Sequence, residues 1–194
     1  WNAMTRYSTW IEPSLNFEWS DLMQQYAKSH GIEVNLSELM EHLRWLDPEH
    51  DTSLVRKVVS NQIYNGNKVH CVWSGSILQE KQCAIDHCFP FSVFACNDLW
   101  NLLPAKASIN IKKSDKLISS STLLDSRPRI EDWWNNAYFQ EETREYAERF
   151  RREALASLPL SLESENFFDV LFEGVQLKRA TLKQNLNLNE WSPN

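Results

Sequence analysis

The sequence lacks the two features that would direct it to a membrane or to secretion. No apolar run approaches the roughly 20 residues that a helix needs to cross a bilayer. No charged stretch followed by a short apolar stretch, the pattern of a secretory signal, opens the sequence. We therefore expect no membrane partner and a cytoplasmic location.

Cysteine is scarce, and its placement argues against a disulfide framework. The four cysteines, Cys71, Cys83, Cys88 and Cys96, lie in one central region. The framework of a small secreted domain is usually denser and better spread. We therefore expect reduced thiols, and we expect Cys83, Cys88 and Cys96 to be small buried hydrophobic residues rather than metal ligands.

The sequence also lacks an excess of positive charge. It has 20 lysines and arginines against 26 aspartates and glutamates, which gives a formal net charge of −6. Nonspecific nucleic-acid binding relies on basic surface, so any nucleic acid has to meet a local positive patch. The alternative is that a larger parent protein or a targeting partner supplies the missing charge.

What the sequence does contain is enough apolar material for a real core. Hydrophobic residues make up 42% of the 194 positions, and nine tryptophans and nine phenylalanines argue against disorder. We expect one compact domain of the α+β class. It would have an N-terminal helical flank (4–68), a central core (69–118) and a C-terminal helical extension (119–194).

Apolar residues recur at helical spacing over most of the chain. Helices are predicted over residues 16–30, from Asn35 to the Asp47-Pro48 pair, and over 51–64, 97–103, 105–115, 131–158 and 163–186. Residues 119–128 are predicted to be a polar linker, and the polar C-terminal end is predicted to fray. Two β-type runs, KVHCVW (68–73) and QCAIDHCF (82–89), are predicted to pair as a hairpin.

Polar groups that can bind metal or move protons collect after the second β-type run. Asp86 offers a carboxylate, which is a good ligand for a hard cation such as Mg²⁺. The neutral imidazole of His87 can take a proton from water near pH 7. Asn110 adds an amide oxygen on the helix predicted to follow. Three lysines come next, which could either contact phosphates or form a solvated helix face: Lys112, Lys113 and Lys116.

These residues resemble the HNH endonucleases, which have the ββα-metal fold. The pattern consists of Asp86-His87, Pro90, the stretch NDLWNLLP (97–104) and Asn-x-x-Lys-Ser (110–114). His87 lies 14 positions before Asn101, which lies 9 before Asn110. Both spacings are usual for the family. The resemblance covers roughly residues 69–118 and is closest to the HNN-type variant, with asparagine at the last position.

The resemblance implies a role for each matching residue. His87 resembles the general base that deprotonates the attacking water. Asp86 and Asn110 resemble the ligands of one divalent cation, Mg²⁺ or Mn²⁺. Asn101 resembles the asparagine that braces the loop and orients the histidine, and Lys113 is expected to contact a phosphate.

Further basic residues are candidates for binding nucleic acid: Lys112, Lys116, Arg56 and Lys57, with Arg127 and Arg129 as weaker ones. For Arg56, Lys57, Arg127 and Arg129, the alternative is an ordinary surface role.

No structural zinc is expected. Many HNH proteins carry two Cys-x-x-Cys pairs, but here the stretch CVWS (71–74) keeps only the first cysteine. Packing of Trp73 and Trp100 is therefore expected to hold the hairpin.

The expected activity is hydrolysis of DNA phosphodiester bonds, as in restriction or phage defence. Three alternatives stay open. One is cleavage of RNA, because the motif touches backbone more than base. The second is a catalytically silent module that binds nucleic acid or a partner, against which the presence of Asp86, His87 and Asn110 argues. The third is that the helical flanks form an interaction platform for a partner that directs the nuclease.

Overall fold

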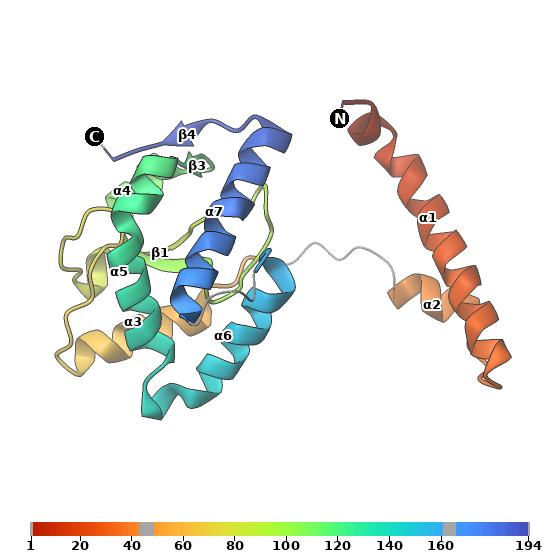
Figure 1. Cartoon of the computed structure of the whole chain (residues 1–194), viewed down its shortest axis with the longest axis horizontal. Helices are drawn as coiled ribbons and strands as arrows, with labels where there is room; N and C mark the ends of the chain where they lie inside the picture. The colour runs from red at the N-terminus through yellow and green to blue at the C-terminus, as the bar shows by residue number, and fades with distance from the viewer. Residues whose placement is uncertain (1, 43–48, 161–165, 194) are drawn as a thin grey trace. The chain divides into compact units, whose positions relative to one another are not determined.

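The computed structural model describes residues 2–42, 49–160 and 166–193, and it divides the chain into two compact units (Figure 1). The first unit is Trp1–Asp47 and the second is Pro48–Asn194. This division differs from the single compact domain that we expected. The predicted helix stop at Asp47-Pro48 and the predicted helix start at Glu163 lie outside the described residues.

The first unit contains two helices, α1 (Asn2–Ser29) and α2 (Leu36–His42). Both were predicted, although α1 begins well before residue 16. Gly31, which follows α1, has a φ of +74°, a value that glycine adopts without steric cost. The Asn35 side chain accepts a hydrogen bond from the Ser37 backbone N–H (2.9 Å), so it caps α2 as expected.

The second unit is built on an antiparallel hairpin followed by a short helix. Strand β1 (Cys83–His87) pairs with β2 (Leu102–Lys106), and His87 lies opposite Leu102. Helix α4 (Ala107–Lys113) begins directly after β2 and packs on both strands. The predicted ββα arrangement and the α+β class are therefore confirmed.

The predicted partner of β1 is wrong. The run KVHCVW (68–73) makes only an isolated bridge, between His70 and Ile77, and Val72 N–H donates to the Pro104 carbonyl on β2 (3.0 Å). Helices were predicted over 97–103 and 105–115, on either side of Pro104; the first is absent, and Leu102–Lys106 is a strand instead. Proline is tolerated on an edge strand, at a position where no backbone N–H has to donate to a neighbouring strand. The residues from Leu102 to Ala105 are buried, which favours their pairing with β1.

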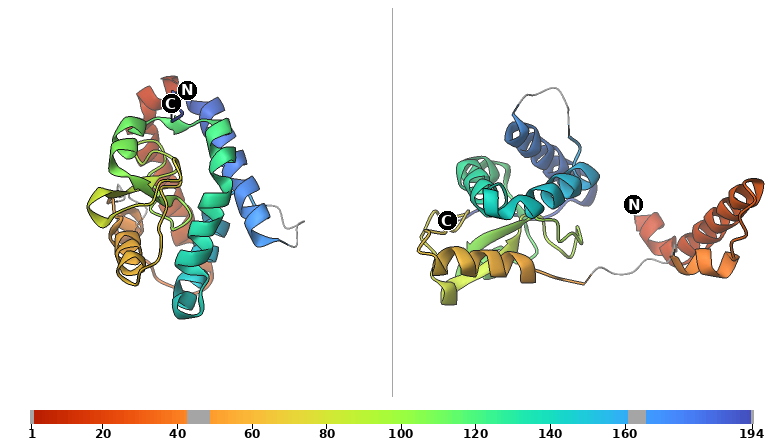
Figure 2. Two further views of the ribbon diagram at one scale, coloured as in Figure 1. Left: turned by 90° about the vertical axis from the view of Figure 1, so that its left-hand side faces the viewer. Right: turned by 90° about the horizontal axis from the view of Figure 1, so that it is seen from below.

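Helices cover both faces of the hairpin. Helix α3 lies on one side, and α5 and α6 lie on the other (Figure 2, right). The bounds of the helices in this unit, including two short 3₁₀ turns, are α3 (Ser53–Tyr64), η1 (Glu80–Gln82), α5 (Ser120–Tyr138), η2 (Glu141–Thr143), α6 (Arg144–Ser157) and α7 (Phe167–Leu186).

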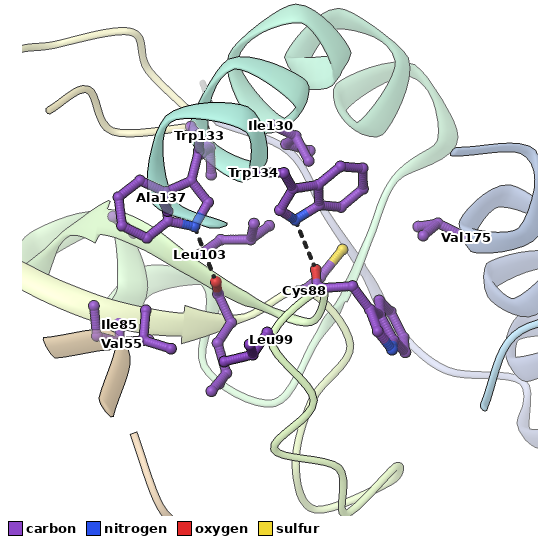
Figure 3. Close-up of a cluster of buried hydrophobic side chains, with 14 of the residues drawn as sticks. Val55, Ile85, Cys88, Leu99, Leu103, Ile130, Trp133, Trp134, Ala137 and Val175 are labelled. Atoms are coloured by element: carbon purple, nitrogen blue, oxygen red, sulfur yellow. Dashed lines mark hydrogen bonds between the residues drawn. The ribbon is translucent and has the colours of Figure 1, made fainter. Parts of the chain in front are cut away.

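Two adjacent tryptophans on α5 attach the C-terminal helices to the hairpin. The Trp133 indole N–H donates to the Leu102 carbonyl (3.4 Å), and the Trp134 indole N–H donates to the Trp100 carbonyl (3.2 Å), as Figure 3 shows. Trp73 and Trp100 are buried, as expected for residues that hold the hairpin by packing. Burial of such large side chains contributes about 2–3 kcal/mol each.

Two predictions for the C-terminal extension are wrong. The stretch 119–128 is not a linker, because Ser119 caps α5 by accepting from the Thr122 backbone N–H (3.2 Å). Pro128 lies on the exposed side of α5, where water can bond the carbonyl that proline leaves unpaired. The helix predicted over 131–158 is interrupted between α5 and α6 by η2.

The predicted fraying is wrong for residues 190–191. Strand β4 (Glu190–Trp191) pairs in parallel with β3 (Leu117–Ile118), and the Trp191 side chain is buried. This pairing fixes β4 next to the residues that follow α4. None of the helices in the described residues combines the length and the apolar character needed to cross a membrane.

Candidate active site

A cavity of about 390 Å³ lies where the end of β1, helix α4 and the start of α3 meet. Four residues predicted for the site from the motif line it: Asp86, His87, Asn110 and Lys113. Arg56, predicted to bind nucleic acid, lines the same cavity. The structure thus brings together the carboxylate, the imidazole and the amide on which the sequence analysis depends.

The Asp86 carboxylate is buried at the inner side of the cavity. One of its oxygens accepts from the Lys113 ammonium (3.0 Å), and the other accepts from the Trp73 indole N–H (2.6 Å). Burial raises the pKa of Asp86 above its ordinary value, and the Lys113 charge is the strongest influence that opposes this rise. The carboxylate is therefore held in one orientation by two donors.

Lys113 occupies a different place from the one we expected. Its side chain is fully buried, and its ammonium donates to the Asp86 carboxylate and to the His87 backbone carbonyl (2.6 Å). A buried ammonium needs such partners, because an uncompensated charge away from water is costly. In this arrangement Lys113 fixes the end of β1 rather than offering its charge to an exposed phosphate.

The His87 imidazole is buried and receives its orientation from Asn97. His87 Nε2 lies 3.2 Å from Asn97 Oδ1. The same oxygen accepts from the Asp51 backbone N–H (3.2 Å), and Asn97 Nδ2 donates to the Glu49 carbonyl (2.7 Å). These backbone partners fix the orientation of the Asn97 amide, so that its oxygen faces His87. Because this oxygen can only accept, His87 Nε2 carries the hydrogen and Nδ1 keeps its lone pair.

The environment of His87 keeps its ring neutral. The pKa of His87 is lowered to about 4, mainly by burial and to a smaller extent by the charges of His50 and Lys113, while the hydrogen bond to Asn97 opposes this shift. At pH 7 the imidazole is therefore unprotonated and free to accept a proton.

Asn101 lies behind the cavity, fully buried, and braces the loop after β1. Its side chain accepts from the Phe89 backbone N–H (2.9 Å) and donates to the Cys96 carbonyl (3.0 Å). Its own carbonyl accepts from the Cys88 N–H (2.7 Å). The bracing role fits this geometry, but the hydrogen bond to the histidine ring comes from Asn97.

The other predicted basic residues lie outside this cavity. Lys112 and Lys116 are exposed at the end of α4 and just beyond it. Lys57 lines a second cavity, of about 620 Å³, on the N-terminal half of α3. Arg127 and Arg129 are engaged within the protein, the first with Glu131 and Asp169, the second with the Val72 carbonyl and Ser126.

The cysteines are free thiols. Cys88 is buried, and Cys83 and Cys96 are half-buried. Burial raises the pKa of Cys83 to about 11 and that of Cys88 to about 12, so neither is a thiolate near neutral pH. Cys88 is a small buried residue of the core, as expected, whereas Cys83 and Cys96 are only partly buried and pack against that core.

Residues 63–118 match the HNH endonuclease family. The match spans β1, β2 and α4 and confirms the resemblance for this HNH segment. It indicates a nuclease with a nucleic-acid substrate, and HNH nucleases generally use a divalent metal. Residues 1–43 match a domain of unknown function (DUF8808). No curated protein matches the chain.

Three residues near the site were missed from the sequence: Trp73, Asn97 and His50. Trp73 was expected only to pack, and Asn97 lies within the quoted motif without a role of its own. The His50 ring centroid lies 4.7 Å from that of His87. His50 lies before the HNH segment, so the motif gave no signal for it.

The donor set of the site fits a partly hydrated divalent cation. Mg²⁺ usually binds one or two protein carboxylates, several waters and substrate phosphates rather than an all-protein cage. Asp86 and Asn110 bring two hard oxygen donors to one cavity. Among the described residues, no three histidines, cysteines, aspartates or glutamates form a cage. Each Asp86 oxygen already accepts one hydrogen bond and has a further lone pair available.

Proposed function

We propose that this chain is a metal-dependent endonuclease that hydrolyses DNA phosphodiester bonds, with His87 as the general base. The observation that carries the proposal is that His87, Asp86 and Asn110 line one cavity at the end of the ββα hairpin. The family match over the HNH segment supports the same reaction class.

Asp86 and Asn110 would hold one divalent cation, Mg²⁺ or Mn²⁺. When bound, such a cation stabilises the negative charge that develops on the phosphate and on the leaving oxygen. Trp73 and Lys113 fix the orientation of the Asp86 carboxylate, so that one ligand is in position before the cation arrives.

His87 performs the proton transfer. Its Nδ1 takes a proton from a water molecule, and the water oxygen forms a bond to phosphorus while the bond to the 3′ oxygen breaks. The products are a 5′-phosphate and a 3′-hydroxyl. Because the pKa of His87 is lowered, the ring is unprotonated at the start of the step, as a base has to be.

Four basic residues are candidates for contacting the nucleic acid. Arg56 lines the cavity itself, Lys57 lines the neighbouring one, and Lys112 and Lys116 are exposed at the end of α4 and just beyond it. They would supply the local positive patch that a chain with a net charge of −6 needs.

The experiment that tests this proposal is nicking of supercoiled DNA by the wild-type chain. We expect cutting with Mg²⁺ or Mn²⁺ and none with chelator. A labelled RNA of the same sequence is the second substrate. Cutting of RNA alone would overturn the assignment to DNA. Binding of DNA without cutting of either substrate would indicate a silent binding module.

A further inference from the structure

We infer that His50 is a second catalytic residue, whose imidazole N–H donates a hydrogen bond to the phosphate attacked by the water that His87 activates. This inference rests on the proposed function. It concerns a residue that lies before the HNH segment and that the motif does not include.

The first observation is the position of His50. Its ring lines the same cavity as His87, Asp86 and Asn110, and its centroid lies 4.7 Å from that of His87. The Phe91 ring packs edge-on against both imidazoles, at 4.9 Å from His50 and 5.2 Å from His87. A phosphate within reach of water at His87 therefore also lies beside His50.

The second observation is that both neighbours of His50 in the chain are fixed. Asn97 donates to the Glu49 carbonyl (2.7 Å) and accepts from the Asp51 N–H (3.2 Å), while it also bonds His87. One asparagine thus sets the positions of both histidines. A group held in this way is oriented before substrate binds, which reduces the cost of ordering it in the reaction.

The third observation is the difference in exposure between the two imidazoles. His87 is 5% exposed, whereas His50 is an exposed residue. No described residue hydrogen-bonds to either ring nitrogen of His50. Its ring can therefore reach a ligand without breaking a bond within the described structure.

The fourth observation identifies the class of ligand as a phosphodiester backbone. His50, Thr52 and Arg56 line both the 390 Å³ cavity and the neighbouring 620 Å³ cavity. A chain that passes from one cavity to the other has to cross these residues. His50 and Arg56 carry N–H donors, and Arg56 is also a permanent cation. Such donors suit successive phosphates of one strand.

In the reaction, His50 keeps its proton. Its N–H would donate to a nonbridging oxygen of the phosphate, where negative charge increases as water bonds to phosphorus. The proton of the water goes to His87, and solvent protonates the leaving 3′ oxygen. His50 therefore acts on the charge of the transition state and not on the proton balance.

The test compares three replacements of His50 in the full chain. His50→Phe keeps a ring against His87 and Phe91 but removes the N–H, and His50→Gln keeps an N–H. We expect the single-turnover rate at saturating DNA to fall about 100-fold for His50→Phe, the size expected for loss of one such donor. His50→Gln should retain more activity, and added imidazole should restore part of the rate of His50→Ala.

His30→Phe is the matched control, because His30 is an exposed histidine that lines neither of the two cavities. A His50→Phe variant that cuts as fast as this control would show a packing role and overturn the inference. A raised KM with an unchanged kcat would also overturn it, since His50 would then only bind substrate.

A second readout does not depend on cleavage. Histidine ring ¹⁵N spectra of the metal-free His87→Ala variant are recorded with a phosphorothioate oligonucleotide. We expect the His50 signals to shift while the His30 signals stay in place. Unshifted His50 signals would contradict the inference. If wild type cuts nothing but His50 shifts, the proposed hydrolysis fails while the His50 phosphate contact stands.

Discussion

The Lys113 ammonium lies 3.0 Å from the Asp86 carboxylate, with both side chains buried at the inner side of the cavity. This ion pair links helix α4 to the end of β1, next to the proposed general base. The ammonium is placed on the carboxylate that is also the proposed metal ligand, so stability and metal binding depend on the same pair.

Removing Lys113 should destabilise the fold. Lys113→Met leaves Asp86 buried without its cation, which costs about 3–5 kcal/mol in the free energy of unfolding. Urea denaturation measures this loss. Lys112→Met is the control, because Lys112 is exposed on the same helix, and it should change stability little. Equal stability of the two variants would show that the ion pair does not matter.

Lys113 should also compete with the metal. In Lys113→Met the Asp86 carboxylate keeps the Trp73 hydrogen bond but has no ammonium beside it. Loss of the competing positive charge should outweigh loss of one orienting donor, so Mn²⁺ affinity measured by calorimetry should rise several-fold over wild type. The double variant Asp86→Asn/Lys113→Met should lose this binding. Asp125→Asn, on the exposed side of α5, is the control. Unchanged Mn²⁺ binding in the double variant would exclude Asp86 as a ligand.

Asn97 should control both the orientation and the tautomer of His87. Asn97→Leu removes the acceptor at 3.2 Å, so the ring can turn and its hydrogen can move to Nδ1. We expect the cleavage rate to fall by about 10–100-fold, as for other residues that orient a functional histidine. Ring ¹⁵N spectra should show hydrogen on Nε2 in wild type and a mixture in the variant. Asn136→Leu is the control, because Asn136 is exposed. A wild-type cleavage rate for Asn97→Leu would show that Asn97 does not orient His87 for the reaction.

Acid should destabilise the protein through His87. Its pKa is about 4 in the folded state and near 6.5 when unfolded, so only the unfolded chain gains this proton between these values. The contribution of neutral His87 is therefore complete above pH 6.5 and is lost as pH falls toward 4, by up to about 3 kcal/mol. The free energy of unfolding of wild type minus that of His87→Gln should decline over this range. A constant difference would mean that the pKa of His87 is not lowered.

The sequence predicted the centre of the site better than its surroundings. Asp86, His87 and Asn110 lie within one motif of fixed spacing, so their meeting at the hairpin and α4 could be foreseen. Lys113 belongs to the same motif, but its burial could not be foreseen, because three neighbouring lysines look alike in sequence. Only the packing of α4 on the strands separates it from exposed Lys112.

Other features depend on contacts between distant parts of the chain. Leu102 and Leu103, before Pro104, are compatible with a helix or a strand. They form a strand because they pair with β1. His50 comes near His87 because Asn97 holds the segment before α3 and Phe91 packs against both rings. The start of α5 was not predicted, because the residues from Ser119 to Pro128 are mostly polar. The apolar side of α5 faces the hairpin.

The most direct test of the account is the rate of Mg²⁺-dependent DNA nicking by His87→Ala compared with wild type and with His30→Ala. Thermal unfolding and DNA binding are measured on the same samples, so that loss of folding or binding is separated from loss of chemistry. We predict that His30→Ala cuts at the wild-type rate, while His87→Ala binds DNA and stays folded but does not cut. Cutting by His87→Ala at the wild-type rate would contradict the assignment of His87 as the base.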